Sequence, residues 1–142
     1  MADSLSDRAV LVTGASSGIG RAIALAAARA GADVAITYRA NERGARDVES
    51  EIRSLGRRTS VIKFDLSDAK SLKALGPAAA AALGRIDVWI NNAGADILTG
   101  DAAALSTEAK LDLLLTVDLR GTMLASWQAA ELMGTQDRKS VV

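Results

Sequence analysis

The chain has 142 residues, 49% of them hydrophobic and 24% charged, and its 17 basic residues balance its 17 acidic ones. This composition suits one modest globular domain, and the zero net charge argues against a nucleic-acid binder held by bulk charge. The sequence contains no cysteine and no histidine, which excludes disulfides, zinc sites built on those residues and a Ser-His-Asp triad within this chain.

The start of the chain carries no targeting signal that we can identify. The first eight residues, MADSLSDR, are polar and lack the apolar core of a signal peptide. No apolar run approaches membrane-spanning length, because Arg21, Arg29 and Asp33 interrupt the longest candidate. We therefore expect a cytoplasmic protein without membrane or nucleic-acid partners.

Short apolar runs alternate with helical patterns along the first part of the chain. Residues 9–12 are expected to form a buried strand, and residues 19–30 a helix that follows a glycine-rich loop. A second strand is expected over 34–38 and an exposed helix over 41–55. A glycine directly after each pattern is expected to end each helix.

The same alternation continues. A third strand is expected over 60–64, followed by a turn in which Ser67 can cap the next helix. Leucines at helical spacing mark that helix, but Gly76-Pro77 should kink or restart it, because proline lacks the N–H and clashes with the preceding turn. A fourth strand is expected over 87–90.

The last part of the chain is expected to be mainly helical. The pattern predicts a helix over 106–133 with a change of direction near 118–121, and the beginning of a fifth strand at 140–142. Strands that alternate with helices indicate a parallel sheet covered on both faces. We predict the strand order 3-2-1-4, with residues 140–142 beside the fourth strand.

Three glycines stand where the first strand turns into a helix. Gly14 allows a tight turn, while Gly18 and Gly20 remove Cβ atoms where the backbone must come close to a ligand or to the sheet. The helix directs its free N–H groups and positive dipole end at the loop, which suits a pyrophosphate, and Ser16 and Ser17 add hydroxyl donors. The alternative is a glycine-rich turn without a ligand. The spacing is Gly-x-x-x-Gly-x-Gly, which differs from the common Gly-x-Gly-x-x-Gly fingerprint.

A second signal, Asn91-Asn92-Ala93-Gly94, follows the fourth strand. In an open parallel sheet, ligands bind beyond the carboxyl ends of the strands, so the loops after strands one and four can flank one crevice. Paired asparagines can bond a ribose or brace the neighbouring backbone. Alone the segment is an ordinary turn; together with the glycine loop it favours a ligand site.

These motifs resemble the short-chain dehydrogenase/reductase family. TGASSGIG at 13–20 and NNAG at 91–94 stand in the family's order at the ends of strands one and four, and GRID at 84–87 and VDLRGTM at 117–123 are also similar to family segments. The resemblance covers essentially the whole chain. AITYRANERG at 35–44 is similar to the glucose dehydrogenase and 3-oxoacyl carrier-protein reductase branches.

The resemblance implies an NAD(P)-dependent oxidoreductase that acts on a small-molecule carbonyl or alcohol substrate. It implies an α/β Rossmann-type fold, a doubly wound parallel sheet in three layers, here incomplete at its C-terminal side. Asn91 is expected to brace the backbone. The implied cofactor-binding residues come from the ends of all four strands: Gly14, Ser16, Ser17, Gly18, Ile19, Gly20, Tyr38, Arg39, Asp65, Leu66, Asn92, Ala93 and Gly94.

Tyr38-Arg39 bears on the choice of cofactor. An NAD-selective site places an acid at the end of the second strand, and the only acid of this strand region, Asp33, stands at its other end. Arg39 instead offers a positive fork to a 2′-phosphate, although it could be an ordinary surface arginine. We expect NADP(H), with NAD(H) as the second candidate.

The family's proton-transfer residues are not found in this chain. The resemblance places a serine and a Tyr-x-x-x-Lys pair beyond the fifth strand, whereas the only tyrosine here is Tyr38. Residues 1–142 are therefore expected to be the N-terminal dinucleotide-binding part of a longer enzyme and to be inactive alone. Asp118 occupies the position of a family asparagine that helps to hold the lysine; an acid there can accept hydrogen bonds but cannot donate as an amide does, and it could simply cap a helix.

The family commonly forms dimers or tetramers through the helix that follows residue 118. Leu119, Met123 and Trp127 could face such a partner or belong to the core, and we expect the core. Ala95 and the residues up to Gly100 could form one wall of a substrate pocket.

Two other functions fit parts of the sequence. A methyltransferase-like Rossmann domain would need an acid at the end of the second strand and does not explain NNAG. A non-catalytic dinucleotide-binding or interaction protein would suit the missing tyrosine. A P-loop hydrolase is excluded, because no Gly-Lys-Ser/Thr follows the loop.

Overall fold

Five parallel strands form a single sheet in the order β3-β2-β1-β4-β5. The computed structural model describes residues 4–136 and 140–141. The strands are β1 (Ala9–Val12), β2 (Asp33–Tyr38), β3 (Thr59–Lys63), β4 (Val88–Ile90) and β5 (Ser140–Val141). The predicted strand order is confirmed, and β5 pairs with β4 through Ser140 and Val141. The expected strand residue Val142 lies outside the described residues.

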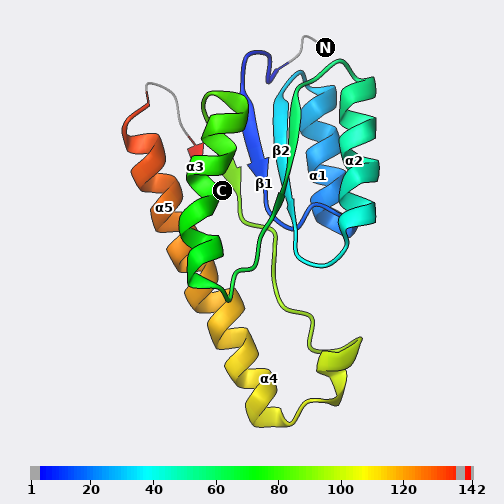
Figure 1. The fold of residues 1–142 in the computed structure, drawn as a ribbon, viewed down its shortest axis with the longest axis vertical. Coiled ribbons are helices and arrows are strands. Elements are labelled where there is room, and N and C mark those ends of the chain that lie inside the picture. Colours follow the sequence, from blue (N-terminus) through cyan, green and yellow to red (C-terminus); the bar gives the residue numbers. More distant parts are fainter. Residues whose placement is uncertain (1–3, 137–139, 142) are drawn as a thin grey trace.

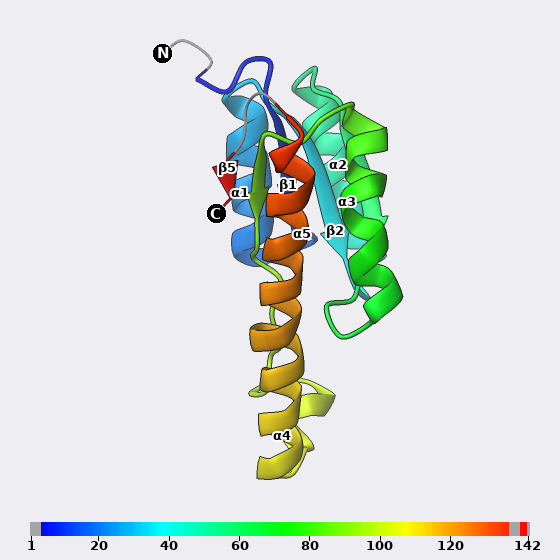
Figure 2. The same cartoon turned by 90° about the vertical axis from the view of Figure 1, so that its left-hand side faces the viewer.

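Helices cover both faces of the sheet, so the molecule has the expected three layers. Figures 1 and 2 show α1 and α2 against one face and α3 and α5 against the other. The helical segments are α1 (Gly18–Arg29), α2 (Glu42–Ser54), α3 (Ala69–Leu83), η1 (Asp101–Ala104), α4 (Thr107–Leu114), η2 (Leu115–Gly121) and α5 (Thr122–Gly134). In the described part of the chain, no helix is both long and apolar enough to cross a bilayer.

Alternate residues of β1 enter two separate cores. Leu11 packs with Trp89 and the apolar sides of α3 and α5, while Val10 and Val12 pack with α1 and α2. Each of the four β1 residues is buried, which explains why a continuous apolar run formed this strand.

The N-terminus of α3 differs from the expectation. Asp68, and not Ser67, is the N-cap, because its carboxylate accepts from the Ser71 N–H at 2.8 Å. The Ser67 hydroxyl instead donates to Asp65 Oδ1 at 2.6 Å. Ser67 and Asp68 are both residue types that cap helices, and the Ser67 hydroxyl is already bonded to Asp65.

Helix α3 neither ends nor restarts at Gly76-Pro77. The side-chain amide of Gln128, from α5, donates to the Leu72 carbonyl at 2.6 Å and accepts from the Gly76 N–H at 2.8 Å. A proline weakens the preceding turn of a helix, and here a neighbouring helix supplies polar partners for that turn.

The expected change of direction near 118–121 is also wrong. Figure 2 shows α4, η2 and α5 following one another as one long rod that extends beyond the sheet. The seven residues of η2 are π-helical. Asp118 lies inside this rod and does not cap a helix. At Gly121 a Cβ would lie 2.7 Å from the Leu66 carbonyl oxygen, so the π-helical stretch approaches the β3–α3 connection closely.

One side of the rod is apolar and exposed. Leu119, Met123 and Trp127 are 54%, 44% and 63% exposed, so the expectation that they belong to the core is wrong. Leu111 and Leu115, earlier in the rod, are 54% and 46% exposed. These five residues are called the apolar stripe below.

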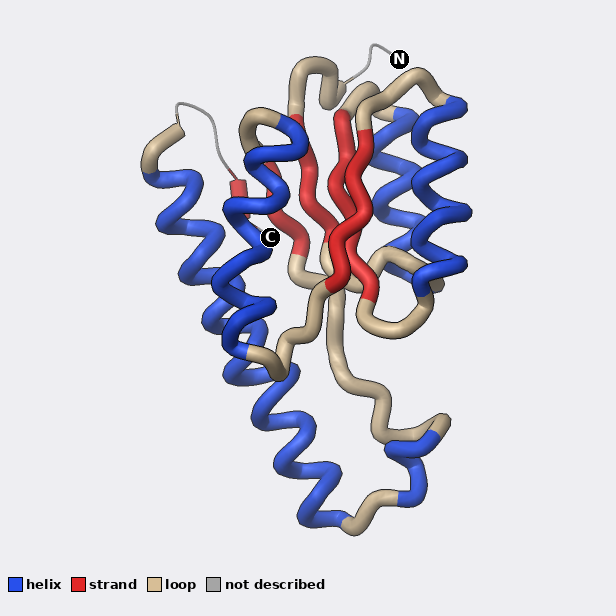
Figure 3. The backbone as a smooth tube through the Cα atoms, in the orientation of Figure 1, coloured by secondary structure: helices blue, strands red, loops and turns tan. Residues whose placement is uncertain are grey.

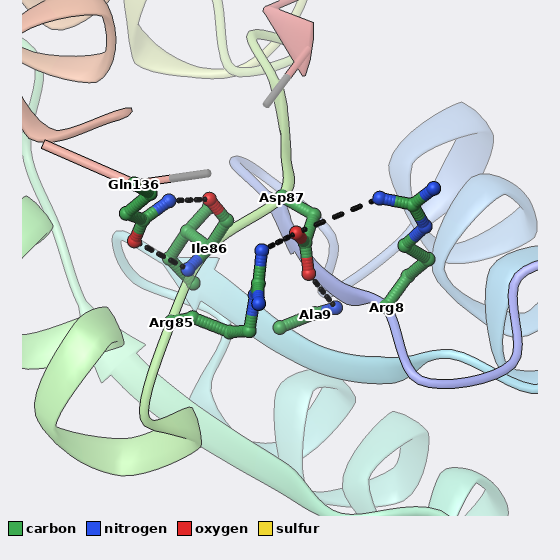
Figure 4. A network of polar contacts seen from close by, with 6 residues as sticks. All are labelled: Arg8, Ala9, Arg85, Ile86, Asp87 and Gln136. Atoms are coloured by element: carbon green, nitrogen blue, oxygen red, sulfur yellow. Dashed lines mark hydrogen bonds and ion pairs between the residues drawn. The ribbon is translucent and has the colours of Figure 1, made fainter. Parts of the chain in front are cut away.

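Figure 4 shows the polar network at the amino ends of the strands. Asp87 is 1% exposed; its carboxylate accepts from the Ala9 N–H at 2.9 Å and from Arg85, and it forms an ion pair with Arg8. The Gln136 amide bonds both backbone groups of Ile86. This network joins β1 to the start of β4 at the end of the sheet opposite the loops described next.

Candidate functional site

The loops at the carboxyl ends of the strands surround an open cleft of about 810 Å³. Figure 3 shows these connections below the strands, with η1 and α4 extending farther in the same direction. The cleft is lined by Thr37 of β2, by residues that follow β1, β2, β3 and β4, and by part of the rod: Gly14, Ser16, Ser17, Ile19, Gly20, Arg39, Ala40, Asn41, Phe64, Asp65, Leu66, Asn92, Ala93, Gly94, Ala95, Asp96, Thr99, Gly100, Asp101, Ala102, Leu105 and Val117.

Most residues that the sequence singled out for a cofactor meet in this cleft. The two exceptions are Gly18 and Tyr38, which do not line it. Tyr38 is 9% exposed and packs in the core between the sheet and helices α1 and α2. The structure thus brings together the two glycine-containing motifs, although ligand binding by each residue stays a prediction.

Gly14 and Gly20 are required by close contacts within the chain. Gly14 has a φ of +65°, and a Cβ there would lie 2.9 Å from the Ala93 Cα atom. A Cβ at Gly20 would lie 2.3 Å from the Gly14 carbonyl oxygen. The first glycine thus allows the turn and the second lets α1 approach it.

Asn92 and Thr13 fasten the loop after β1 to the loop after β4. The Asn92 amide donates to the carbonyl oxygens of Thr13 and Gly14 at 3.1 and 3.0 Å. The Thr13 hydroxyl accepts from the N–H groups of Asn92 and Ala93, both at 3.0 Å. Because Thr13 is 1% exposed, these bonds lie in a poorly solvated place and fix the two loops relative to each other.

Asn91 is a brace, but it bonds side chains and not the backbone as expected; the backbone is held by Asn92. Its side-chain oxygen accepts from the Trp89 indole N–H at 3.1 Å, and its amide donates to the Ser126 hydroxyl at 3.0 Å. These bonds join the end of β4 to α5 through residues that do not line the cleft.

Thr37 is a residue that the sequence analysis missed. Its hydroxyl accepts from the Gly14 N–H at 3.0 Å and its carbonyl accepts from the Ala15 N–H at 2.9 Å. It lines the cleft and supports the glycine loop from β2. A threonine that follows the apolar residues 34–36 near the end of the strand was the available signal.

The first turn of α1 offers donors to the cleft. Ser17 is the N-cap residue but makes no side-chain capping hydrogen bond, and the first turn contains no acidic residue. The backbone N–H groups of this turn, with the hydroxyls of Ser16 and Ser17, therefore form a donor set that suits an anion.

Arg39 and Asp65 carry opposite charges at the cleft. Burial raises the pKa of Asp65, but the hydrogen bonds from Ser67 and the positive charge of Arg39 outweigh it and hold the pKa below its usual value. Asp65 is therefore ionised at neutral pH, and the exposed Arg39 guanidinium lies close enough to act on it.

Asp118 holds the segment that leaves the NNAG motif. Its Oδ1 atom accepts from the Ala95 N–H at 2.8 Å, and a Cβ at Gly94 would lie 3.1 Å from the same oxygen. Farther along, Asp96 accepts from the N–H groups of Leu98 and Thr99. Two carboxylates therefore hold the segment 95–100 that was expected to form a wall: Asp118 from the π-helical stretch and Asp96 from within the segment.

Comparison with known proteins gives a consistent result. The family model described as short chain dehydrogenase matches residues 8–142. The uncharacterized oxidoreductase YghA of Escherichia coli (strain K12) is 46% identical over 105 residues, which are 73% of this chain and 36% of that protein. The L-rhamnose 1-dehydrogenase (NAD(P)(+)) of Sphingomonas sp. (strain SKA58) is 43% identical over 90 residues, 63% of this chain and 35% of that protein.

Solved structures agree with the sequence matches. The crystal structure of a short chain dehydrogenase from Burkholderia cenocepacia J2315 in complex with NADP is 38% identical, with a TM-score of 0.81 over 91% of this chain and 52% of that one. This chain therefore spans only about a third to a half of the length of these relatives. With the family model matched from residue 8 onward and this fold, the chain belongs to the short-chain dehydrogenase family.

Proposed function

We propose that this chain is the N-terminal dinucleotide-binding part of an oxidoreductase that transfers a hydride between nicotinamide and a carbonyl or alcohol carbon. The observation that carries the proposal is the fastening of the glycine-rich loop to NNAG by Asn92 and Thr13 around one cleft. Family membership and the NADP in the Burkholderia structure support it.

The pyrophosphate of the cofactor fits the first turn of α1. Uncapped N–H groups, the hydroxyls of Ser16 and Ser17 and the absence of acids in that turn favour a negative group there. Asn92, Ala93 and Gly94 also line the cleft, and the ribose and nicotinamide would lie beside them. Asp65 and Leu66 would contact the adenine.

NADP(H) is the proposed cofactor, with NAD(H) as a weaker alternative. Arg39 is the charged residue that follows β2, and its guanidinium would bind the 2′-phosphate. Asp33, the acid of β2, is at the far end of the strand and is paired with Arg57 and Arg58 at 3.0 and 2.8 Å. It is therefore not available to a ribose hydroxyl.

Proton transfer is assigned to residues outside this chain. Tyr38 is buried in the core and does not line the cleft, so it does not serve as the acid or base. The serine and the Tyr-x-x-x-Lys pair of the family are expected after Val142. The nicotinamide, when bound, supplies or accepts the hydride; the role of Asp118 here is to position Ala95 and the wall of the substrate pocket.

A homo-oligomer, either a dimer or a tetramer, is proposed for the full-length protein. The apolar stripe of the rod would lie in the interface, because its five side chains are each more than 40% exposed.

The test separates this proposal from a non-catalytic binding or interaction protein. The 142-residue chain is titrated with NADPH, and nicotinamide absorbance is followed with a panel of carbonyl substrates for this chain and for the longer protein that contains it. We expect both proteins to bind NADPH and only the longer one to turn over. Failure of either to bind NADPH would contradict the cofactor site, and turnover by the 142-residue chain alone would contradict the assignment of proton transfer.

A further inference from the structure

One side chain joins the start of α2 to the glycine-rich loop. Asn41 is the N-cap of α2, and its side-chain oxygen accepts from the Gly44 N–H at 3.0 Å. Its amide nitrogen donates to the Ser16 carbonyl oxygen at 3.4 Å. Asn41 therefore performs two separate tasks: it caps its own helix and it connects this helix to the loop assigned to the pyrophosphate.

The contact is close because residue 44 is a glycine. A Cβ at Gly44 would lie 2.4 Å from the Ser16 carbonyl oxygen and 2.4 Å from the Asn41 amide nitrogen. Any larger residue would push the first turn of α2 away from the loop. The sequence thus keeps space for this approach, which a cap alone would not need.

Arg39 lies between this contact and the end of β2. On one side Tyr38 is fixed by its register with Lys63 and by the Phe64 N–H, which donates to the Tyr38 carbonyl at 2.8 Å. On the other side Asn41 is fixed to Ser16, and the Ala40 carbonyl accepts from the Glu42 N–H at 3.1 Å. Only Arg39 and Ala40 span the two fixed points: Thr37 and Tyr38 hold the first end of this segment, and Asn41 holds its second end on the Ser16 carbonyl.

We propose that Asn41 is a positioning residue that sets the preference for a dinucleotide carrying a 2′-phosphate. It acts through Arg39 by fixing the β2–α2 turn to the Ser16 carbonyl. This inference rests on the proposed role of Arg39 in binding NADP(H), and it adds to that role a residue of the cleft lining whose side-chain oxygen and amide are already bonded to Gly44 and Ser16.

The glycine loop itself does not depend on Asn41. Ala15 and Gly14 are bonded to Thr37, and Asn92 holds the Thr13 and Gly14 carbonyls. Loss of the Asn41 bridge therefore leaves the pyrophosphate site in place, and NAD(H), which lacks the 2′-phosphate, should bind nearly as before.

The test compares Asn41→Ala with Asn41→Ser in the full-length protein. Serine keeps an oxygen that can cap Gly44 but removes the amide that reaches Ser16. Dissociation constants for NADPH and NADH are measured by titration, and thermal unfolding is recorded for each variant. We expect the NADH-to-NADPH ratio of dissociation constants to fall about three- to tenfold in both variants, the size of one lost hydrogen bond. The melting temperature should fall with alanine and recover with serine.

Glu51→Gln is the matched control. The Arg21–Glu51 ion pair, 2.5 Å, joins α1 to α2 through residues outside the cap and the glycine-rich loop, so its loss should leave the ratio unchanged. A ratio that recovers with serine, or an equal weakening of both dinucleotides, would show a purely structural role and overturn the inference. Arg39→Ala in the same assay distinguishes the two proposals. If this variant leaves the NADH-to-NADPH ratio of dissociation constants unchanged, the proposed 2′-phosphate site is wrong. If it lowers the ratio while the Asn41 variants do not, only the proposed role of Asn41 is wrong.

Discussion

Replacing Gly20 with alanine should destabilise the fold at the centre of the candidate site. The added Cβ would lie 2.3 Å from the Gly14 carbonyl oxygen and 2.4 Å from the Asn92 amide nitrogen. Non-bonded carbon atoms in ordinary contact are at least about 3.5 Å apart. Either α1 or the glycine loop must therefore move by about 1 Å, and the Asn92 amide must leave its present place.

The loss of folding stability has two contributions, overpacking and lost hydrogen bonds, and a smaller gain partly offsets them. Overpacking of this kind costs about 1–3 kcal/mol. The two hydrogen bonds from the Asn92 amide to Thr13 and Gly14 are worth about 0.5–1.5 kcal/mol each. Alanine gains up to about 1 kcal/mol over glycine through its higher helix propensity. We expect Gly20→Ala to lower the free energy of unfolding by about 3 kcal/mol, a large share of the about 5–15 kcal/mol typical of a domain.

Urea unfolding followed by tryptophan fluorescence measures this loss, because Trp89 is fully buried. The midpoint should fall by about 1–2 M for a domain of this size. Gly134→Ala is the control: it is also a helical glycine, but a Cβ there meets nothing within 4 Å. If Gly20→Ala unfolds at the same urea concentration as Gly134→Ala, the reasoning from this close contact is refuted.

Three further predictions address charge and assembly. Arg39→Ala should weaken NADPH relative to NADH about ten- to hundredfold in a binding titration, because a charge-assisted bond is lost; equal losses for both would contradict this. Burial raises the pKa of Asp33, but hydrogen bonds from Arg58 outweigh it and hold the pKa below the ordinary 3.8. The ionised Asp33 therefore stabilises the folded state above pH 4, and this stabilisation is lost as pH falls through the lowered pKa. Asp33→Asn should therefore be less stable at pH 7, with a shallower decline below pH 4 in acid unfolding curves, and an unchanged acid limb would argue against the ion pair. Trp127→Lys should dissociate the oligomer in sedimentation velocity while Glu131→Lys, at an exposed polar position of the same helix, should not; loss of assembly in both would remove the case for the apolar stripe.

The parts of the fold that depend on local pattern could be predicted from the sequence. Short runs rich in apolar residues indicated the strands, of which β1 and β2 are buried along their whole length. The glycine after each helical pattern indicated the helix ends within a residue or two. The glycine loop could also be interpreted in advance, because few residues adopt the φ of +65° that Gly14 has. The meeting of the loops after β1 and β4 followed from strand order alone.

Features that depend on tertiary contacts could not be predicted in this way. The π-helical stretch makes contacts with two segments far from it in the sequence, through the Asp118 bond to the Ala95 N–H and the approach of Gly121 to Leu66, and local pattern does not reveal such contacts. The position of Tyr38 was ambiguous for a different reason: every residue of β2 is buried, so the strand has no polar alternation to indicate which face a side chain takes. Trp127 is a residue type that is common in cores, but α5 packs on the sheet through Ala125, Ala129 and Met133, and Trp127 is 63% exposed.

The central place of β1 has a consequence for synthesis on the ribosome. β1 is synthesised first, yet it pairs with β2 on one edge and with β4 on the other. The Ala9 N–H can bond the Asp87 carboxylate only after residue 87 has been synthesised. A nascent chain grows at about 5–20 residues per second, so one apolar edge of β1 stays open for several seconds after β2 has formed. Chains stalled before Asp87 should therefore be captured by chaperones that recognise apolar strands, and chains stalled well after Ile90 should escape them.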